Sequence, residues 1–314
     1  MRFERLFLLA AFAVAGILPL IMRNEYLVHI GVIILFSMTM AASFNLIVGY
    51  IGEFPLGHTA FLGVGAYTAA ILSTRLGLPI YATVPIGGIF SAIAGLFIGS
   101  ITLRLRGPFF VIVTLCFAEV LRLVASNWVD LTNGPMGVSG IPKPGWIATQ
   151  STLGQKMCFY YIAWLIAAIT LYVCFRFVYS NLGRAAIAVR ENRFVAQSVG
   201  IKPYRYALLT FVVAALLCGF AGSFYAHYIS YVGPEVFGFP FMISMIIMVL
   251  LGGKGTLAGV IVGPIVIVLL QEYLRDLQTL RLSIFGLIVM AVVLFLPNGL
   301  MGFVGRRREI YARI

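Results

Sequence analysis

Charged side chains that interrupt the apolar sequence are the groups able to do chemistry in this chain. Glu119 and Arg122 lie three residues apart within one apolar run, and Glu272 and Arg275 repeat this spacing. Residues three or four apart share a face of a helix, so each pair predicts a local ion pair. An ionisable residue within a membrane-spanning run is also the usual mark of a functional site. Both interpretations fit Glu119 and Arg122, and the local ion pair is the simpler.

Motifs of catalysis, metal binding and nucleotide binding are missing from the sequence. It has no HExxH or GxSxG pattern, no paired carboxylates in its apolar runs and no CxxC spacing among its four cysteines. Gly52 and Gly57 have the spacing of a P-loop, but His58 stands where the P-loop lysine is required. We therefore expect no catalytic residues, no metal and no cofactor, and we do not expect an enzyme.

The composition is that of a membrane protein. Of the 314 residues, 61% are hydrophobic and 10% are charged, whereas a soluble domain has about 25% charged residues. The net charge of +12 would suit nucleic acid, but the basic residues lie between apolar runs and at the chain ends. This placement is typical of a polytopic protein that follows the positive-inside rule, so we expect a lipid bilayer and no nucleic acid as partner.

Apolar runs of nearly spanning length predict an all-α polytopic bundle of about ten transmembrane helices, some broken by glycine-rich segments. The predicted spans lie near 6–22, 27–50, 59–74, 81–103, 108–125, 157–179, 207–228, 240–252, 257–274 and 282–300. With both termini cytoplasmic, 15 of the 22 basic residues lie on the cytoplasmic side. We predict one transmembrane domain over 1–314, with a periplasmic loop at 126–156 and a cytoplasmic loop at 180–206.

Two glycine-rich segments, 49–65 and 251–264, interrupt the apolar sequence at comparable places in its two halves. Glycine and proline disfavour a helix interior, and paired interruptions indicate an internal repeat and a substrate path. The first segment is either an ordinary cytoplasmic turn or a break within the membrane, which requires cover by protein or a water-filled path. The candidate path residues are Gly49, Gly52, Glu53, Gly57, His58, Gly252, Gly253 and Gly255.

The basic loop at 180–206 predicts one amphipathic helix. Ser180 or Asn181 is a suitable N-cap, and Gly200 and Pro203 are typical of a helix end. Such a helix either rests on lipid headgroups or docks into a groove of a partner protein. The mixed charge, which includes Glu191, favours a partner.

At this loop the sequence resembles the LivM-type permease subunits of branched-chain amino-acid ABC importers, and the resemblance covers nearly the whole chain. The residues that carry it are NLIVGYIGEFPLGHTAFLGVGAYTAA (45–70), LRLRGPFFVIVTLCFAEVLRLVASNW (103–128), LTNGPMGVSGIP (131–142), GRAAIAVRENRFVAQSVGIKPYRYALLTFVVAALLCGFAGSFYAHY (183–228), LGGKGTLAGVIVGP (251–264) and LFLPNGLMG (294–302). The resemblance implies a bundle of about ten helices in the bacterial inner membrane. It also implies four partners: a second homologous permease subunit, two cytoplasmic ABC ATPase subunits and a periplasmic substrate-binding protein.

The resemblance further implies that the cytoplasmic loop couples the bundle to the ATPases. The corresponding residues here are Arg184, Arg190, Glu191, Phe194, Val195, Ala196 and Gly200. The family's coupling loop is of the Glu-Ala-Ala-x3-Gly type; of this pattern only Ala196 and Gly200 are kept, and the glutamate is absent. An ion pair from that position is therefore not expected.

Branched-chain amino acids are the substrates that the resemblance implies. Permeases for urea, short amides or aromatic acids have similar sequences and are the alternatives. An ion-coupled secondary transporter is a rival from another class, and it would need titratable residues deep in the spans. Only Glu53 and His58 meet that requirement in this sequence.

Overall fold

The computed structural model describes residues 24–105 and 107–275, together with 16, 19, 286, 287, 290 and 299–301. The predicted spans at 6–22 and 282–300 and both chain ends lie outside the described residues, apart from these few positions. The other eight predicted spans all coincide with helices. These helices are α2 (Glu25–Tyr50), α3 (Thr59–Leu76), α4 (Ile80–Thr102), α5 (Pro108–Asn127), α8 (Thr152–Val178), α11 (Pro203–Ile229), α12 (Phe239–Gly252) and α13 (Gly259–Tyr273).

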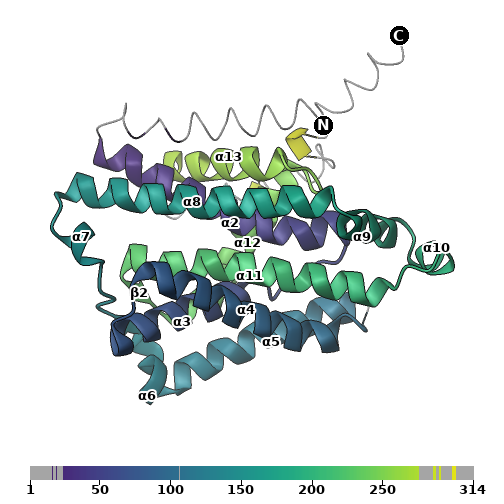
Figure 1. Cartoon of the computed structure of the whole chain (residues 1–314), viewed down its shortest axis with the longest axis horizontal. Helices are drawn as coiled ribbons and strands as arrows, with labels where there is room; N and C mark the ends of the chain where they lie inside the picture. Colours follow the sequence, from purple (N-terminus) through teal and green to yellow (C-terminus); the bar gives the residue numbers. More distant parts are fainter. Residues whose placement is uncertain are drawn as a thin grey trace, which may run out of the picture.

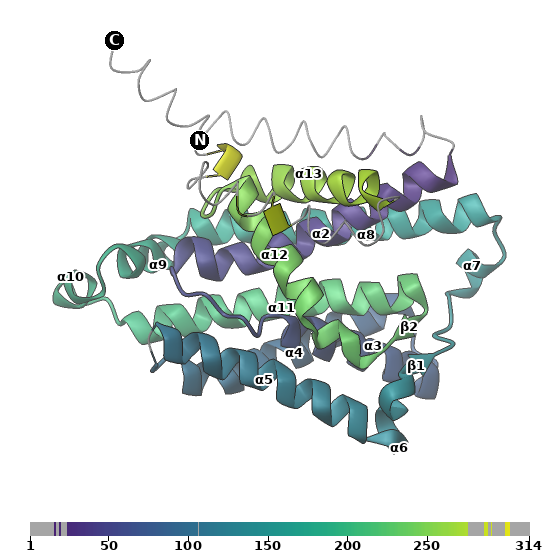
Figure 2. The ribbon, with the colours of Figure 1, turned by 180° about the vertical axis from the view of Figure 1, so that it is seen from behind.

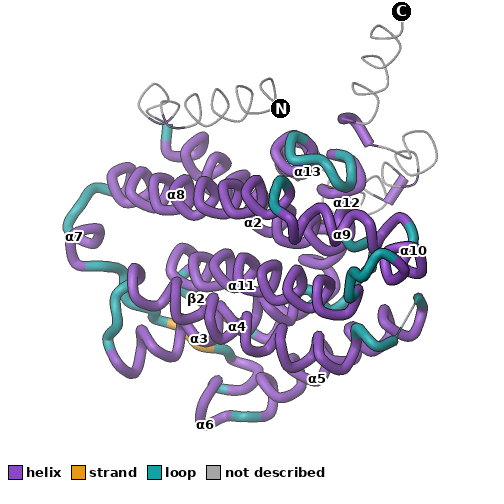
Figure 3. Tube along the Cα trace, turned by 45° about the vertical axis from the view of Figure 1, so that its right-hand side comes forward, coloured by secondary structure: helices purple, strands orange, loops and turns teal. Residues whose placement is uncertain are grey.

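The helices run roughly along one axis and form a bundle (Figure 1). Six segments of the described residues are long and apolar enough to cross a membrane: α2, α4, α5, α8, α11 and Pro234–Gly252. The predicted class, an all-α polytopic membrane protein, is confirmed. Only one pair of two-residue strands is seen in the described part of the chain, β1 (Val138–Ser139) and β2 (Tyr231–Val232), which pair antiparallel (Figure 3).

Shorter elements complete the connections at the two ends of the bundle. The connection at 128–151, within the predicted 126–156 loop, contains α6 (Val129–Thr132), η1 (Gly134–Met136), β1 and α7 (Gly145–Ala148). The segment η2 (Pro234–Phe237) follows β2. The basic loop contains α9 (Asn181–Glu191) and α10 (Arg193–Ser198), which project together at the end opposite α7 (Figure 1).

Contacts between helix ends give the direction of each helix. Lys156 Nζ lies 3.1 Å from Glu25 Oε2, so α2 and α8 begin at the same end. His29 near the start of α2 contacts Tyr228 near the end of α11, so these two helices are antiparallel. We call the end that holds 50–53, 103–105, 176–205 and 252–258 the basic end.

Charge is distributed unequally between the two ends. The basic end holds two described acidic residues, Glu53 and Glu191, and eight described basic ones: Arg104, Arg176, Arg184, Arg190, Arg193, Lys202, Arg205 and Lys254. The opposite half holds five of each sign: Arg75, Arg122, Lys143, Lys156 and Arg275 with Glu25, Glu119, Asp130, Glu235 and Glu272. This asymmetry is the positive-inside pattern that the sequence predicts.

Residues 51–58 form a re-entrant segment. After α2 ends at the basic end, the chain runs back into the bundle and α3 begins well inside it (Figure 2). His58 Nε2 lies 3.0 Å from Ser43 Oγ, and Ser43 is seven residues, or about 10 Å, before the end of α2. Of the two interpretations of this segment, the structure therefore shows the break within the bundle.

A second re-entrant segment enters from the opposite end at 230–238. It includes β2 and η2, and it meets the first segment where Thr59 Oγ1 donates to the Phe237 carbonyl at 2.9 Å. The helices α3 and α12 therefore both begin inside the bundle and run to opposite ends. Gly52 and Gly57 have the same spacing as Gly233 and Gly238, and each pair follows a Tyr-Ile or Tyr-Val dipeptide.

The partner of the first break is thus 230–238, and the predicted pairing with 251–264 needs correction. Residues 253–258 form instead the short turn that joins α12 to α13 at the basic end. The two re-entrant segments enter from opposite ends, as inverted repeats require. Because the glycine spacing of both 230–238 and 251–264 resembles that of the first segment, spacing alone does not tell which one is its counterpart.

Candidate translocation and coupling site

Arg190 of α9 joins the basic loop to the glycine-rich segments. Its Nη1 donates a hydrogen bond to the Gly49 carbonyl at the end of α2. Its Nη2 lies 2.6 Å from Glu191 Oε1, and its Nε donates to the same oxygen at 3.2 Å. A methyl group on Gly52 would come within 2.8 Å of Arg190 Cγ, so the chain passes the arginine closely. Arg190 therefore connects α9 directly to the end of α2.

Asn45 of α2 binds the second glycine-rich segment, 251–264, close to the start of the first one at Gly49. Its Oδ1 accepts from the Gly255 amide at 2.8 Å, and its Nδ2 donates to the Thr256 carbonyl at 3.3 Å. Gly255 has φ +75°, a conformation that favours glycine. A methyl on Gly49 would come within 2.6 Å of Gly255 Cα, so two backbones meet here without side chains. Sequence reasoning missed Asn45, whose signal is an amide inside an otherwise apolar run.

The structure divides the predicted path residues into two groups. Those at the basic end are Gly49, Gly52, Glu53, Gly252, Gly253 and Gly255, and three of them, Gly49, Gly52 and Gly255, lie next to Arg190. Gly57 and His58 lie deep in the bundle, where Gly57 packs against the Thr114 carbonyl of α5. Their assignment to a translocation path stays a prediction.

His58 anchors the first re-entrant segment. Its side chain is fully buried and lies between the rings of Phe44 and Phe61, with centroids 5.5 Å away in each case. Its carbonyl accepts a weak bond from Cys218 Sγ of α11 at 3.8 Å. The imidazole thus contacts α2 and α3, and the carbonyl of His58 contacts α11.

A cavity of about 150 Å³ opens where both re-entrant segments approach α5. Its lining residues are Leu56, Thr59, Leu115, Ala118, Glu119, Arg122, Phe237, Gly238, Phe239 and Met242. Arg122 Nε donates to Glu119 Oε1 and Oε2 at 3.0 and 2.9 Å, so the local ion pair predicted from their spacing is confirmed. Sequence reasoning found this pair but gave no reason to place it beside Gly238 and Phe239.

The basic loop forms two helices, and the prediction of one continuous helix is wrong. The predicted cap is confirmed, because Ser180 Oγ accepts from the Gly183 amide at 3.3 Å. Asn192 interrupts the helix with an extended backbone at φ −157° and ψ 110°. Its side chain accepts from the amides of Phe194 and Val195 at 3.0 and 3.1 Å, and so caps α10.

The apolar residues of the two helices divide into a buried set and an exposed set. Ala185 and Ala186 of α9 and Ala196 of α10 are buried against the bundle. Phe194 is 70% exposed, and Val195 and Val199 are exposed beside it. Gly200 has φ +85°, as expected of a glycine that ends a helix. The tip of α10 therefore presents apolar side chains outward.

A groove of about 450 Å³ runs along the α10–α11 connection. It is lined by Arg193, Gln197, Gly200, Ile201, Lys202, Pro203 and Tyr204. Arg184 is exposed on α9 and donates to Asn181 of the same helix, so it does not contribute to this groove.

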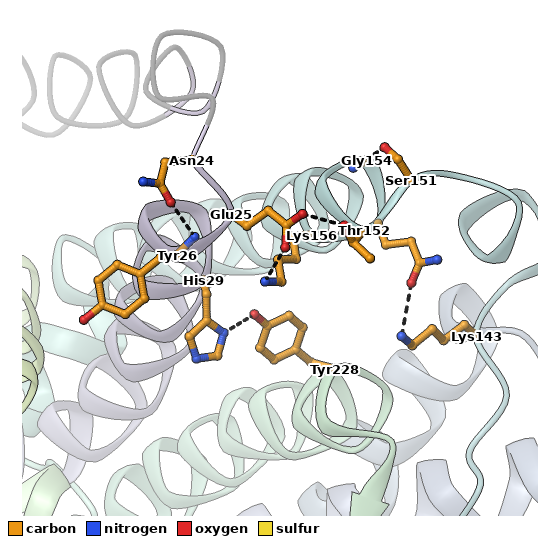
Figure 4. Close-up of polar contacts among 11 residues, drawn as sticks. Asn24, Glu25, Tyr26, His29, Lys143, Ser151, Thr152, Gly154, Lys156 and Tyr228 are labelled. Carbon is orange, nitrogen blue, oxygen red and sulfur yellow. Dashed lines mark hydrogen bonds and ion pairs between the residues drawn. The ribbon is translucent and has the colours of Figure 1, made fainter. Parts of the chain in front are cut away.

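A polar cluster ties α2, α8 and α11 together at the other end of the bundle (Figure 4). Glu25 of α2 accepts from Thr152 and Lys156 of α8, while His29 contacts Tyr228 of α11 at 2.5 Å. Lys143 of the connecting loop donates to Gln155 at 3.2 Å. The 126–156 segment is thereby held against the helix ends.

The fold and these sites define a polytopic helical membrane protein with two re-entrant segments that meet inside the bundle. Residues 7–297 match the family described as branched-chain amino acid transport system / permease component. The chain therefore belongs to this family of transport permeases.

Relatives with curated names are consistent with this placement. The chain is 32% identical to the high-affinity branched-chain amino acid transport system permease protein LivM of Escherichia coli, over 95% of this chain and 75% of that protein. It is 24% identical to the E. coli permease LivH, over 84% of this chain and 90% of that protein, and 26% identical to the Pseudomonas aeruginosa permease BraD over the same shares. No solved structure matches the chain.

Proposed function

We propose that this chain is a membrane-spanning subunit of an ATP-driven importer and translocates branched-chain amino acids. In this proposal a periplasmic binding protein delivers the substrate, and a second homologous permease subunit completes the pathway. Two cytoplasmic ATPase subunits supply the energy. The relatives are named as branched-chain amino-acid permeases, and the names LivM and LivH denote two kinds of permease component.

The observation that carries the proposal is the contact of Arg190 with Gly49. It connects α9, which packs at the basic end of the bundle, to α2, and Asn45 of α2 connects that helix to the α12–α13 turn. A displacement of α9 would therefore act on α2 and on the α12–α13 turn at the same place. Glycines at the point of contact leave room for backbones to slide, because they have no side chains to interlock.

The direct test is uptake by a reconstituted complex. The chain is placed in liposomes with its second permease subunit and ATPases, and the binding protein is loaded with labelled leucine. We expect ATP-dependent accumulation of leucine inside the liposomes, and none with ATPases that cannot hydrolyse ATP. Accumulation that follows a proton or sodium gradient without ATP would overturn the proposal in favour of a secondary transporter.

The basic end is assigned to the cytoplasm of a bacterium, and the protein to its inner membrane, with both termini cytoplasmic. The charge asymmetry between the two ends supports this orientation. Reporter fusions after Asn133 and after Asn192 should therefore report the periplasm and the cytoplasm, respectively. Reports from the same side, or the reverse order, would contradict the topology.

The exposed tip of α10 is the proposed ATPase contact. A helix in a partner's groove is anchored by its apolar residues, so Phe194→Asp should release the ATPases while the bundle folds normally. Copurification of the ATPases should fall by roughly tenfold or more, as expected when an anchoring aromatic residue is lost. Met136→Asp is the matched control, because Met136 is 76% exposed in the loop near the opposite end.

Gly200→Val provides a second test at the same tip. A β-branched residue at φ +85° strains the turn after α10 and should reduce uptake. If Phe194→Asp and Gly200→Val both keep full uptake and bound ATPases, α9 and α10 instead rest on lipid.

A further inference from the structure

The Glu119–Arg122 pair lies in an environment that a purely structural ion pair does not explain. Of the six segments that could span a membrane in the described part of the chain, α5 is the least buried. Its outward face is apolar, with Ile112, Val120 and Leu123 exposed. Yet Glu119 and Arg122 lie on this helix with side chains 51% and 38% exposed. Charged residues within spans usually face a water-filled cavity or a bundle interior, and these two line a cavity.

The cavity combines charges of both signs with an apolar wall. Glu119 is its only acidic lining residue and Arg122 its only basic one, and the described residues supply neither with a second charged partner. Leu56, Leu115 and Met242 form part of the apolar wall. A cavity of about 150 Å³ accepts an apolar group of the size of benzene, so a branched side chain of three or four carbons fits.

The first residues of two helices also line this cavity. Thr59 begins α3, and Phe239 begins α12 directly after Gly238. The N-terminal end of a helix carries partial positive charge, and half-helices that begin inside a membrane bundle direct this charge at anionic groups of substrates. Together with Arg122, these ends favour a carboxylate in the cavity, while Glu119 favours an ammonium group.

We infer that this cavity is a transient binding site for an amino acid, and that it takes both the charged amino and carboxylate groups and the branched side chain. The inference rests on the proposed function, because it names a site at which the transported substrate binds on its way through the protein. Arg122 binds the α-carboxylate, Glu119 binds the α-ammonium group, and the apolar wall takes the side chain. When the ammonium and carboxylate groups of the substrate enter, the single Glu119–Arg122 ion pair is replaced by two ion pairs with the substrate, so no charged group is left without a partner.

Exchange of the two charges tests the inference. The double variant Glu119→Arg, Arg122→Glu keeps an ion pair three residues apart, and therefore keeps any purely structural role. It reverses the charges that the substrate meets. Position 122 then carries a carboxylate, which repels the substrate carboxylate from the place that the helix ends favour for it. We expect leucine uptake by the reconstituted complex to fall by roughly tenfold or more, while binding-protein-stimulated ATP hydrolysis remains.

The second Glu–Arg pair of the chain provides the matched control. Glu272 and Arg275 have the same spacing, with 3.1 Å between Arg275 Nη1 and Glu272 Oε1, and they do not line the cavity. Their exchange should leave uptake unchanged. If the Glu119–Arg122 exchange also supports normal uptake, the pair is structural and the inference is wrong, although the proposed function stands. If the unmodified complex itself fails to take up leucine, the proposed function fails first.

A substitution in the apolar wall keeps the inference testable if the exchanged pair does not assemble. Ala118→Val extends two methyl groups toward the cavity and should hinder leucine more than valine, which is one methylene smaller. The ratio of leucine to valine uptake should fall by about fourfold, the worth of one methylene in an apolar site. An unchanged ratio would show that the substrate side chain does not enter this cavity.

Discussion

We expect the replacement of Gly57 by alanine to destabilise the protein strongly and to abolish uptake. A Cβ atom at this position would overlap the Thr114 carbonyl of α5, which is backbone and has no alternative rotamer. Overpacking of this kind costs about 1–3 kcal/mol and occasionally more. The re-entrant segment would have to move away from α5, which would shift His58 from Ser43 and Thr59 from Phe237. Thermal unfolding of the purified protein in detergent measures the loss.

Gly145→Ala is the matched control for this substitution. Gly145 begins α7, and a methyl group there would meet nothing within 4 Å. Its free energy of unfolding should stay within about 0.5 kcal/mol of the original protein. If Gly57→Ala is as stable as Gly145→Ala, the segment does not pack against α5 as the structure shows.

We expect Arg190→Ala to uncouple ATP hydrolysis from transport. The side chain joins α9 to the Gly49 carbonyl, and its own exposure is only 35%. A charge-assisted hydrogen bond of this kind contributes about 1–2 kcal/mol once solvent screening is allowed for. Its loss should lower leucine uptake by roughly tenfold, while the ATPases stay bound through the tip of α10. Uptake and ATP hydrolysis measured on the same liposomes give the coupling ratio.

Arg176→Ala separates this effect from a general loss of positive charge. Arg176 is exposed near the end of α8 at the same basic end of the bundle. We expect its removal to leave the ratio of uptake to ATP hydrolysis unchanged. An equal loss of coupling in both variants would show that net charge at this end, rather than the contact with Gly49, is what matters.

Arg190→Ala and Gly57→Ala act at two different depths of the bundle, and at each depth distant segments of the chain are in contact. Near the basic end, Arg190 and Asn45 connect α9, α2 and the α12–α13 turn. Deeper in the bundle, Thr59 and Phe237 connect the two re-entrant segments beside α5. In the proposed cycle, ATPase motion acts first on the basic end, and the helices α2 and α12 carry it to the deeper junction.

Close approach of helices is a second role of glycine here, at two pairs of glycines with GxxxG spacing. Gly95 and Gly99 of α4 face α11, where a methyl on Gly95 would come within 2.5 Å of Ala215 Cβ. Gly259 and Gly263 of α13 face the backbone of α12 in the same way. Glycines four residues apart lie on one face of a helix, so they let the neighbouring helix approach closely.

The helices themselves followed from the sequence, since apolar length and the penalty on buried backbone groups depend on local composition alone. The Ser180 cap, the end at Gly200 and the Glu119–Arg122 pair are equally local, and all three are found. The break at Asn192 was missed, although asparagine is a strong N-cap, because the apolar pattern runs across it without interruption. In each case the deciding interaction spans only a few residues.

Only the tertiary structure decided which distant segments meet. The sequence of residues 51–58 was compatible with a cytoplasmic turn and with a re-entrant segment, because glycine and proline end the preceding helix in either structure. What selects the re-entrant path is the fit of Gly57 against Thr114 and of His58 against Ser43, contacts between residues 15 or more apart in the chain. The pairing of 51–58 with 230–238 and the placing of Glu119 and Arg122 beside two helix ends have the same origin. A sequence states which residues can come close, and the packing of whole helices determines which of them do.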